Sequence, residues 1–184
     1  MHDSITDANV DSFDARQLRD VMSHFATGVV AITGIDPDTG KPVGLAANSF
    51  TSVSLDPPLV AFCVARTSSS WPRIRQAGRY VVNILSDAQE SVCRSLAARG
   101  GDKFADLTWL PSPAGAPVLD NGLAWLETEL EAEHEAGDHV IVVSRVRHIH
   151  AGQEAPLVFY RGRYGRVEHF PLDDDISRVG QVTR

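Results

Sequence analysis

The sequence predicts a mainly β fold: an antiparallel barrel with helices at its periphery. Short apolar and β-branched runs recur along the chain, hairpin-like turns join many of them, and only three segments carry helix signals. Strands joined by turns pair antiparallel, and such sheets tend to close into barrels. A parallel nucleotide-binding sheet would need repeated strand–helix–strand alternation, which the sequence lacks.

Composition limits the class of protein. The chain has 184 residues, a net charge of −7 and 43% hydrophobic residues, which fits one globular domain over 13–168 between an acidic flexible tail over 1–12 and a second tail over 169–184. An acidic chain is a poor binder of nucleic acid, and no apolar run approaches the roughly 18 residues of a membrane span. Cys63 and Cys93 are too few for a secreted disulfide scaffold. We therefore expect a cytoplasmic protein.

The expected strands are short and bounded by turn residues. An Asp-Pro-Asp-Thr-Gly turn over 36–40 follows the first strand, and Pro57-Pro58 ends the second. Strands are expected at 29–33, 43–53, 59–64, 80–85 and 157–160.

Three helices are expected. Ser70 is a candidate N-cap for a short helix that Gly78 ends. Ser86 and Gln89 have the spacing of a capping box at the start of another helix, which ends at residues 100–101. A first helix over 13–26 is indicated by an apolar stripe with the i, i+3, i+4, i+7 spacing, formed by Leu18, Val21, Met22 and Phe25.

The clearest β pattern is a hairpin over 124–150. In its first strand glutamates alternate with mostly apolar residues, so one strand face carries a row of carboxylates at 127, 129, 131, 133 and 135. We expect this row to be a solvated outer face. A three-residue turn over 136–138 would place Arg145 opposite Glu129 and Arg147 opposite Glu127.

Residues 57–86 contain no Asp or Glu, and residues 67–70 within them, Thr-Ser-Ser-Ser, stand at an expected helix start. Backbone N–H groups and hydroxyls at such a start, with arginines nearby, can hold an anion of the phosphate type. The alternative is a capped helix with solvated arginines. The arginines of this segment are Arg66, Arg73, Arg75 and Arg79.

Two further segments could carry chemistry. Residues 46–54 are small and polar, which would let a flat ligand approach the backbone, although an edge strand or bulge has the same composition. His139 lies at a hairpin tip, where functional residues occur but solvated histidines are more common. His148 and His150 share a strand face without further ligands at suitable spacing, so we expect no metal site. Phosphate-loop and nucleophile-elbow motifs are absent, which disfavours kinases and hydrolases.

Residues 44–60, GLAANSFTSVSLDPPLV, closely resemble the short-chain flavin reductase family, the reductase components of two-component flavin-dependent monooxygenases. The resemblance covers about residues 13–166 and implies an FMN-binding split β-barrel, usually a homodimer with the flavin near the subunit interface. Other pieces match in the same order: ATGV at 26–29, S-x-S-W at 68–71, VNIL at 82–85, DKF at 102–104, GDH at 137–139 and PLVFYRG-x-Y at 156–164.

The resemblance also implies roles for individual residues. His139 should bind and orient the nicotinamide, with Tyr164 near it. Along the flavin ring the resemblance places Ala46, Ala47, Asn48, Ser49 and Thr51. It places Cys63, Val64 and Ala65 along the ribityl chain. It places Ser68 and Ser70 at the phosphate, and Lys103 and Phe104 over the flavin.

The implied activity is that of an NAD(P)H:flavin oxidoreductase. It would reduce FMN or FAD with NADH or NADPH and supply reduced flavin to a separate monooxygenase. Because the flavin carries the hydride chemistry, the protein needs mainly to bind and orient the two reactants. Two alternatives stay open: a related split-barrel enzyme with a deazaflavin-type cofactor, and a non-catalytic flavin-binding electron carrier or sensor of the same fold.

Overall fold

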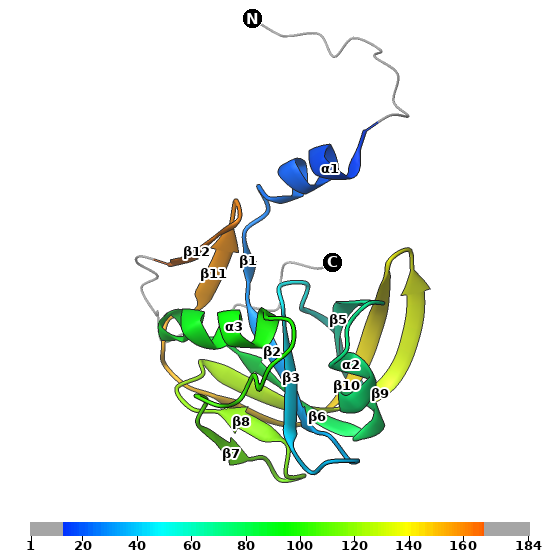
Figure 1. Cartoon of the computed structure of the whole chain (residues 1–184), viewed down its shortest axis with the longest axis vertical. Coiled ribbons are helices and arrows are strands. Elements are labelled where there is room, and N and C mark those ends of the chain that lie inside the picture. The colour runs from blue at the N-terminus through cyan, green and yellow to red at the C-terminus, as the bar shows by residue number, and fades with distance from the viewer. Residues whose placement is uncertain (1–12, 168–184) are drawn as a thin grey trace, which may run out of the picture.

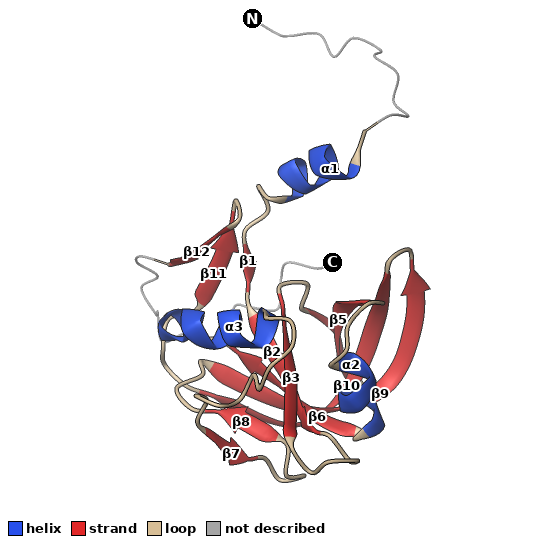
Figure 2. Cartoon of the chain, in the orientation of Figure 1, coloured by secondary structure: helices blue, strands red, loops and turns tan. Residues whose placement is uncertain are grey.

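A computed structural model describes residues 13–167 of the chain. The two expected tails, 1–12 and 169–184, lie outside these residues. Strands dominate the described part, and three short α-helices lie around them (Figures 1 and 2). The expectation of a mainly β fold with peripheral helices is therefore confirmed.

The central feature is a seven-stranded antiparallel sheet with the order β3-β2-β6-β9-β10-β5-β4. The segment expected as one extended run over 43–53 is two strands, which lie at the two edges of this sheet. The chain leaves the sheet over residues 48–50 and rejoins it on the other side. The strands are β2 (Val30–Ile35), β3 (Pro42–Ala47), β4 (Thr51–Leu55), β5 (Pro58–Ala65), β6 (Arg79–Ile84), β9 (Ala124–Ala136) and β10 (His139–Ala151).

The sheet curls until β3 lies beside β5, but within residues 13–167 no ladder joins these two strands. The barrel is therefore open along one seam. Its interior is filled by apolar side chains, among which the rings of Phe62, Trp71 and Tyr80 pack edge to face with centroids 5.4 to 6.3 Å apart. This packing joins β5, α2 and β6 inside the barrel.

Two small sheets complete the β structure. β1 (Thr27–Gly28), β11 (Leu157–Tyr160) and β12 (Arg163–Arg166) form one, and β7 (Trp109–Pro111) pairs with β8 (Pro117–Leu119) in the other. The strand expected at 157–160 is confirmed as β11, whereas β12 had not been expected.

The helices are α1 (Ala15–Met22), α2 (Trp71–Gln76) and α3 (Glu90–Ala97), the last preceded by the 3-10 turn η1 (Asp87–Gln89). The capping box of Ser86 and Gln89 is confirmed. Ser70 stands at the expected N-cap position of α2, but its side chain makes no capping bond, and the Trp71 N–H donates to Ser68 Oγ at 3.2 Å instead. Among the described residues no helix is long and apolar enough to cross a membrane.

The hairpin of β9 and β10 departs from the expected register. Its turn is the two-residue pair Gly137-Asp138, with Gly137 at φ 61°. One bulge restores the expected pairing of Arg145 with Glu129, and a second places His148, not Arg147, opposite Glu127.

The glutamate row is solvated only in part: Glu131 and Glu135 are exposed, as expected, but the Glu127 end of the row is covered. Glu127 is fully buried, and its carboxylate accepts the Ala114 N–H at 2.7 Å and an Arg79 guanidinium N–H at 3.2 Å. The other glutamates of the row also pair with arginines, which come from the neighbouring strands β6 and β10, from α2 and from the segment after β5. These pairs are Arg79–Glu129 (2.9 Å), Arg145–Glu131 (2.8 Å), Arg75–Glu133 (3.1 Å), Arg66–Glu135 (3.3 Å) and Arg147–Glu129.

Candidate functional site

A cleft of about 290 Å³ opens at the seam, between the end of β3 and β5. Nine of the residues singled out from the sequence line it, and Leu45 is the one lining residue that sequence reasoning missed. The nine are Ala46, Ala47, Asn48, Ser49, Cys63, Val64, Ala65, Ser68 and His139. The structure thus brings residues that are up to 93 positions apart in the sequence (46 to 139) around one cleft.

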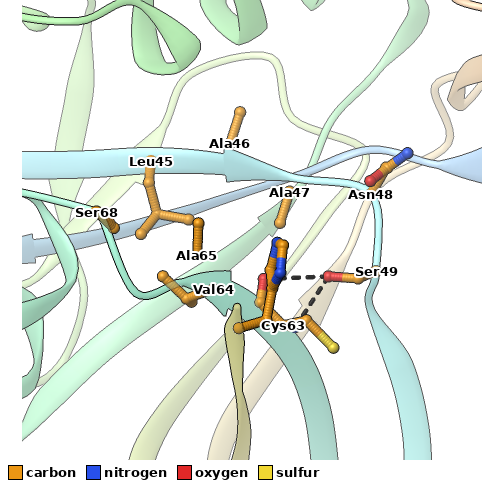
Figure 3. A pocket seen from close by; sticks show the side chains of 10 residues that line it. Leu45, Ala46, Ala47, Asn48, Ser49, Cys63, Val64, Ala65 and Ser68 are labelled. Carbon is orange, nitrogen blue, oxygen red and sulfur yellow. Dashed lines mark hydrogen bonds between the residues drawn. The ribbon is translucent and has the colours of Figure 1, made fainter. Parts of the chain in front are cut away.

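Small side chains line both walls of the cleft. Ala47 and Ala65 have the smallest side chains that a strand can carry, and Figure 3 shows Ala47 pointing toward Cys63 while Ala46 points away. β3 is an edge strand of the described sheet, so the peptide groups on its outer side have no strand partner. Such a wall offers hydrogen bonds to the edge of a planar ring and leaves room for the ring itself.

Ser49 ties the two walls together. Its Oγ accepts the Cys63 N–H at 2.9 Å and donates to the Cys63 carbonyl at 3.3 Å (Figure 3). A side chain thereby continues the hydrogen bonding of β4 and β5 past the end of their ladder, at Thr51 and Ala61. Because the Ser49 hydroxyl donates its proton to the Cys63 carbonyl, Ser49 has no free donor for a ligand. Its role is to hold the two walls of the cleft together.

Ser68 forms the polar end of the cleft. Its Oγ accepts from the Trp71 N–H, so its own hydroxyl proton stays available to a ligand. Ser70 differs from this: it is 2% exposed and is not among the cleft's lining residues. The Ser70 hydroxyl instead lies 3.4 Å from Lys103 Nζ.

Lys103 braces the elements behind the cleft. Its ammonium donates to the Leu96 carbonyl at 2.9 Å and to the Gly44 carbonyl and Ser70 Oγ at 3.4 Å. Burial, with a smaller contribution from Arg73, lowers the pKa of Lys103. The expectation that Lys103 closes directly over a ligand does not match this geometry, because its donors face protein oxygens.

Phe104 also lies behind the cleft. It is 7% exposed and packs in the core under Gly44, where an added Cβ would come within 3.2 Å of the phenyl ring and 2.9 Å of Leu96 Cδ2. The close approach explains the glycine in this strand. The ring is used in core packing and is not among the residues that line the cleft, and the expected contact of Phe104 with a ligand stays a prediction.

His139 begins β10 and faces the cleft at its rim. Its Nδ1 lies 2.7 Å from Asp138 Oδ1, and a hydrogen bond to the imidazole together with its charge lowers the pKa of the Asp138 carboxyl. When Nδ1–H donates to this carboxylate, Nε2 of the neutral ring is an acceptor. The pair therefore offers the cleft an imidazole of defined orientation.

Tyr164 lies elsewhere than expected. It lines a second pocket of about 190 Å³ together with Val29, Cys93 and Phe159, and not the cleft that His139 lines. The Tyr164 hydroxyl is 3.2 Å from Cys93 Sγ, and burial raises the pKa of Tyr164 to about 12 and also raises the pKa of the Cys93 thiol. Both groups are therefore neutral near pH 7.

The second pocket nevertheless adjoins the cleft. Residues 46–48 line both cavities, so the end of β3 is the wall between them. Thr51 lies outside both: it is exposed on β4, and its hydroxyl donates to the Ser52 carbonyl at 3.2 Å.

The chemistry of the cleft fits a planar ring that carries a phosphate. The ring end has the β3 edge, Asn48 and His139, and the other end has the Ser68 hydroxyl near the start of α2. Within the described part of the chain no carboxylate lines the cleft, which favours an anion at the Ser68 end. Among residues 13–167, no group of three His, Cys, Asp or Glu side chains could hold a metal ion.

Comparisons with known proteins agree with this geometry. Residues 22–168 match the family model named flavin reductase like domain. A flavin reductase of Pseudomonas putida is 46% identical over 155 residues, which cover 84% of this chain and 91% of the relative. The reductase subunit HsaB of a flavin-dependent monooxygenase from Rhodococcus jostii is 43% identical over 159 residues, which cover 86% of this chain and 80% of the subunit.

A solved structure is similar as well. The NADH:FAD oxidoreductase SgcE6 of Streptomyces globisporus superposes with a TM-score of 0.79 at 34% identity, over 87% of this chain and 97% of that one. The family match extends over most of the chain and includes every residue that lines the cleft. The chain therefore belongs to the flavin reductase like domain family.

Proposed function

We propose that this protein is an NAD(P)H:flavin oxidoreductase that reduces FMN or FAD and supplies the reduced flavin to a separate monooxygenase. The observation that carries the proposal is the cleft at the seam, where walls of small side chains, the Ser68 hydroxyl and the His139 imidazole hydrogen-bonded to Asp138 meet. The names of the relatives support it, since they include an FMN reductase (NADH) and several monooxygenase reductase subunits.

The protein's part in the reaction is binding and orientation. A flavin bound in the cleft would supply the acceptor for a hydride from the nicotinamide. The outer edge of β3 and Asn48 would hold the ring, and the Ser68 hydroxyl would bind the phosphate. His139, oriented by Asp138, positions the nicotinamide over the ring end of the cleft, since hydride transfer needs the two rings in contact.

The cleft holds its ligand without enclosing it. It lies on the open seam of the barrel and not in a closed core cavity. An open site suits an enzyme whose reduced product must leave for another protein. An electron carrier would instead need to retain its flavin.

The same proposal includes a homodimer, and helix α1 supports it. α1 stands away from the sheets in Figure 1, and the apolar stripe that indicated this helix is exposed, with Val21 69% and Phe25 69% accessible. Exposed apolar side chains grouped on one element are typical of an interface. The other two members of the stripe, Leu18 and Met22, are also exposed, and so is Phe13, which precedes the helix. Light scattering should give twice the chain mass, and Val21→Lys should shift it toward the monomer; a wild-type monomer would contradict the dimer.

The activity is tested by the loss of absorbance of NADH and NADPH at 340 nm, with and without added FMN or FAD. We expect turnover that increases with added free flavin. Flavin that stays bound through gel filtration, with no oxidation of either nicotinamide, would favour the carrier.

The matched variants are His139→Ala and His150→Ala. His150 is exposed at the far end of the same strand and stacks on Trp125 outside the cleft. We expect only His139→Ala to raise the KM for the nicotinamide. Equal effects of the two variants would remove the role given to His139.

A further inference from the structure

A groove of about 780 Å³, larger than the cleft, runs along the hairpin of β11 and β12. Arg161 and Gly162 form its turn with φ values of 49° and 75°. The hairpin brings Arg161, Arg163 and Arg166 to the lining of this one groove. We call it the hairpin groove, and its polar lining includes Tyr160, Arg161, Arg163, Tyr164 and Arg166.

The guanidinium groups of this groove are poorly neutralised. Within residues 13–167 Arg163 makes no ion pair, and the nearest pairing of Arg166 is with Asp87 at 3.9 Å. Arg161 contacts His24 Nε2 at 3.2 Å and lies over the Tyr160 ring at 5.8 Å, neither of which is an anion. In a chain of net charge −7, the hairpin groove is a local site of positive charge.

The hairpin groove, the second pocket and the cleft adjoin one another in that order. Tyr164 lines both the groove and the second pocket, and Asn48 lines both the second pocket and the cleft. The second pocket meets the cleft at residues 46–48, which include Asn48 at the ring end. Ser68, where the flavin phosphate is expected, lies at the opposite end.

We propose that the hairpin groove binds the phosphate groups of the nicotinamide dinucleotide. Guanidinium groups form strong, charge-assisted hydrogen bonds with phosphate oxygens, and Arg163 has its donors free among the described residues. A dinucleotide anchored there can direct its nicotinamide toward the ring end of the cleft. The inference rests on the proposed flavin reductase activity and adds the site that selects this co-substrate.

The test compares a co-substrate that carries phosphates with one that has none. For Arg163→Gln we expect the KM for NADH to rise about tenfold with little change in kcat, the loss of one charged hydrogen bond. The KM for 1-methyl-1,4-dihydronicotinamide, which has no phosphate, should change less than about twofold. Arg163→Lys keeps the charge and should recover part of the loss.

Two controls show whether the change in the KM for NADH comes from the hairpin groove or from a general loss of positive charge or of flavin binding. Lys41→Gln removes an exposed positive charge at the turn between β2 and β3, at the far end of β3 from the cleft, and should leave both KM values unchanged. The FMN dissociation constant of Arg163→Gln, measured by quenching of flavin fluorescence, should equal that of the wild type. If the variant folds poorly, the wild type still tests the groove, because added salt should raise the KM for NADH and not that for the phosphate-free compound.

Several outcomes would overturn the proposal. One is an unchanged KM for NADH in an Arg161→Gln, Arg163→Gln double variant. Another is a loss of FAD affinity in place of NADH affinity, which would assign the groove to the flavin's adenylate. A third is a loss seen only when the oxygenase is present, which would assign it to an acidic protein surface. A wild-type protein that oxidises no nicotinamide at all would instead refute the proposed activity.

Discussion

Two sets of arginines differ in what their positive charge can do. Arg66, Arg75 and Arg79, which the sequence suggested as part of an anion site, each pair with a glutamate of β9. In the hairpin groove, Arg161 and Arg163 have no carboxylate partner within residues 13–167. The first set stabilises the sheet, and the second is available to a ligand.

The difference shows that a run of arginines without nearby acids in sequence says little about free charge. Residues 57–86 contain no Asp or Glu, yet β6 pairs directly with β9, which carries a row of them. The glutamates of β9, which is distant in the sequence, neutralise the charges of Arg66, Arg75 and Arg79 in this segment. The predictions that follow test how far the two sets differ, from the largest expected effect to the smallest.

The largest effect is expected where the paired set is buried. Glu127→Gln should lower the free energy of unfolding by about 2 kcal/mol at pH 7, because it removes a buried carboxylate that accepts two hydrogen bonds and faces Arg79. Urea unfolding measures this, with Glu135→Gln as the control, since the Glu135 side chain is 78% exposed. Equal losses in the two variants would show that burial of the pair does not matter.

The same variant has a defined pH dependence. Burial opposes ionisation of Glu127, but hydrogen bonds from Ser112 and the Ala114 N–H, with His148 and Arg79 nearby, together lower its pKa below 4.5. A lowered folded-state pKa stabilises the fold above the unfolded pKa, and this stabilisation is lost as pH falls through the folded value. The difference between wild type and Glu127→Gln should therefore be full at pH 7 and shrink below about pH 4.5.

A smaller effect is expected at the phosphate end of the cleft. Ser68→Ala should weaken FMN binding about tenfold and riboflavin binding much less, because only FMN carries the phosphate that the hydroxyl would meet. Flavin titration measures both. Ser69→Ala, an exposed neighbour, is the control. Equal losses for the two flavins would indicate that Ser68 acts only through its cap on α2.

Asp138 differs from the glutamates of β9 because its carboxylate pairs with a histidine, His139, and not with an arginine. Asp138→Ala should raise the KM for NADH about threefold with kcat nearly unchanged, because an exposed pair of this kind contributes modestly. Asp138→Asn should retain most of the wild-type KM, since its amide oxygen can still accept Nδ1–H. If Asn and Ala raise the KM equally, the orientation of His139 does not depend on this bond.

The smallest effect is expected for a paired, exposed arginine near the cleft. The Arg66 side chain is 52% exposed and its pair with Glu135 is weak, so Arg66→Gln should change the unfolding free energy by no more than about 0.5 kcal/mol. FMN affinity should change less than twofold. A large loss of FMN affinity would show that this paired arginine still serves the phosphate, which would remove the distinction between the two sets.

Much of the cleft could be predicted because its lining residues come from short segments of the sequence. The small residues at 46–48 and the hydroxyl at 68 have the same size and hydrogen-bonding groups in any fold. Ser70 and Phe104 could not be assigned in this way. Both are residue types that serve a ligand or the core equally well, and only packing against Lys103 and Gly44 showed that they lie behind the cleft.

The sequence by itself determined the β character, the capping box at Ser86 and the alternation of β9, because each depends on neighbours within a few residues. Tertiary structure decided which faces are covered. Alternation placed Glu127 on the outer side of its strand, but the loop that carries Ala114 folds over that side and buries it. Likewise, the division of residues 43–53 into two edge strands depends on how the sheet curls. Burial and free charge arise from contacts distant in sequence, and a local pattern does not contain them.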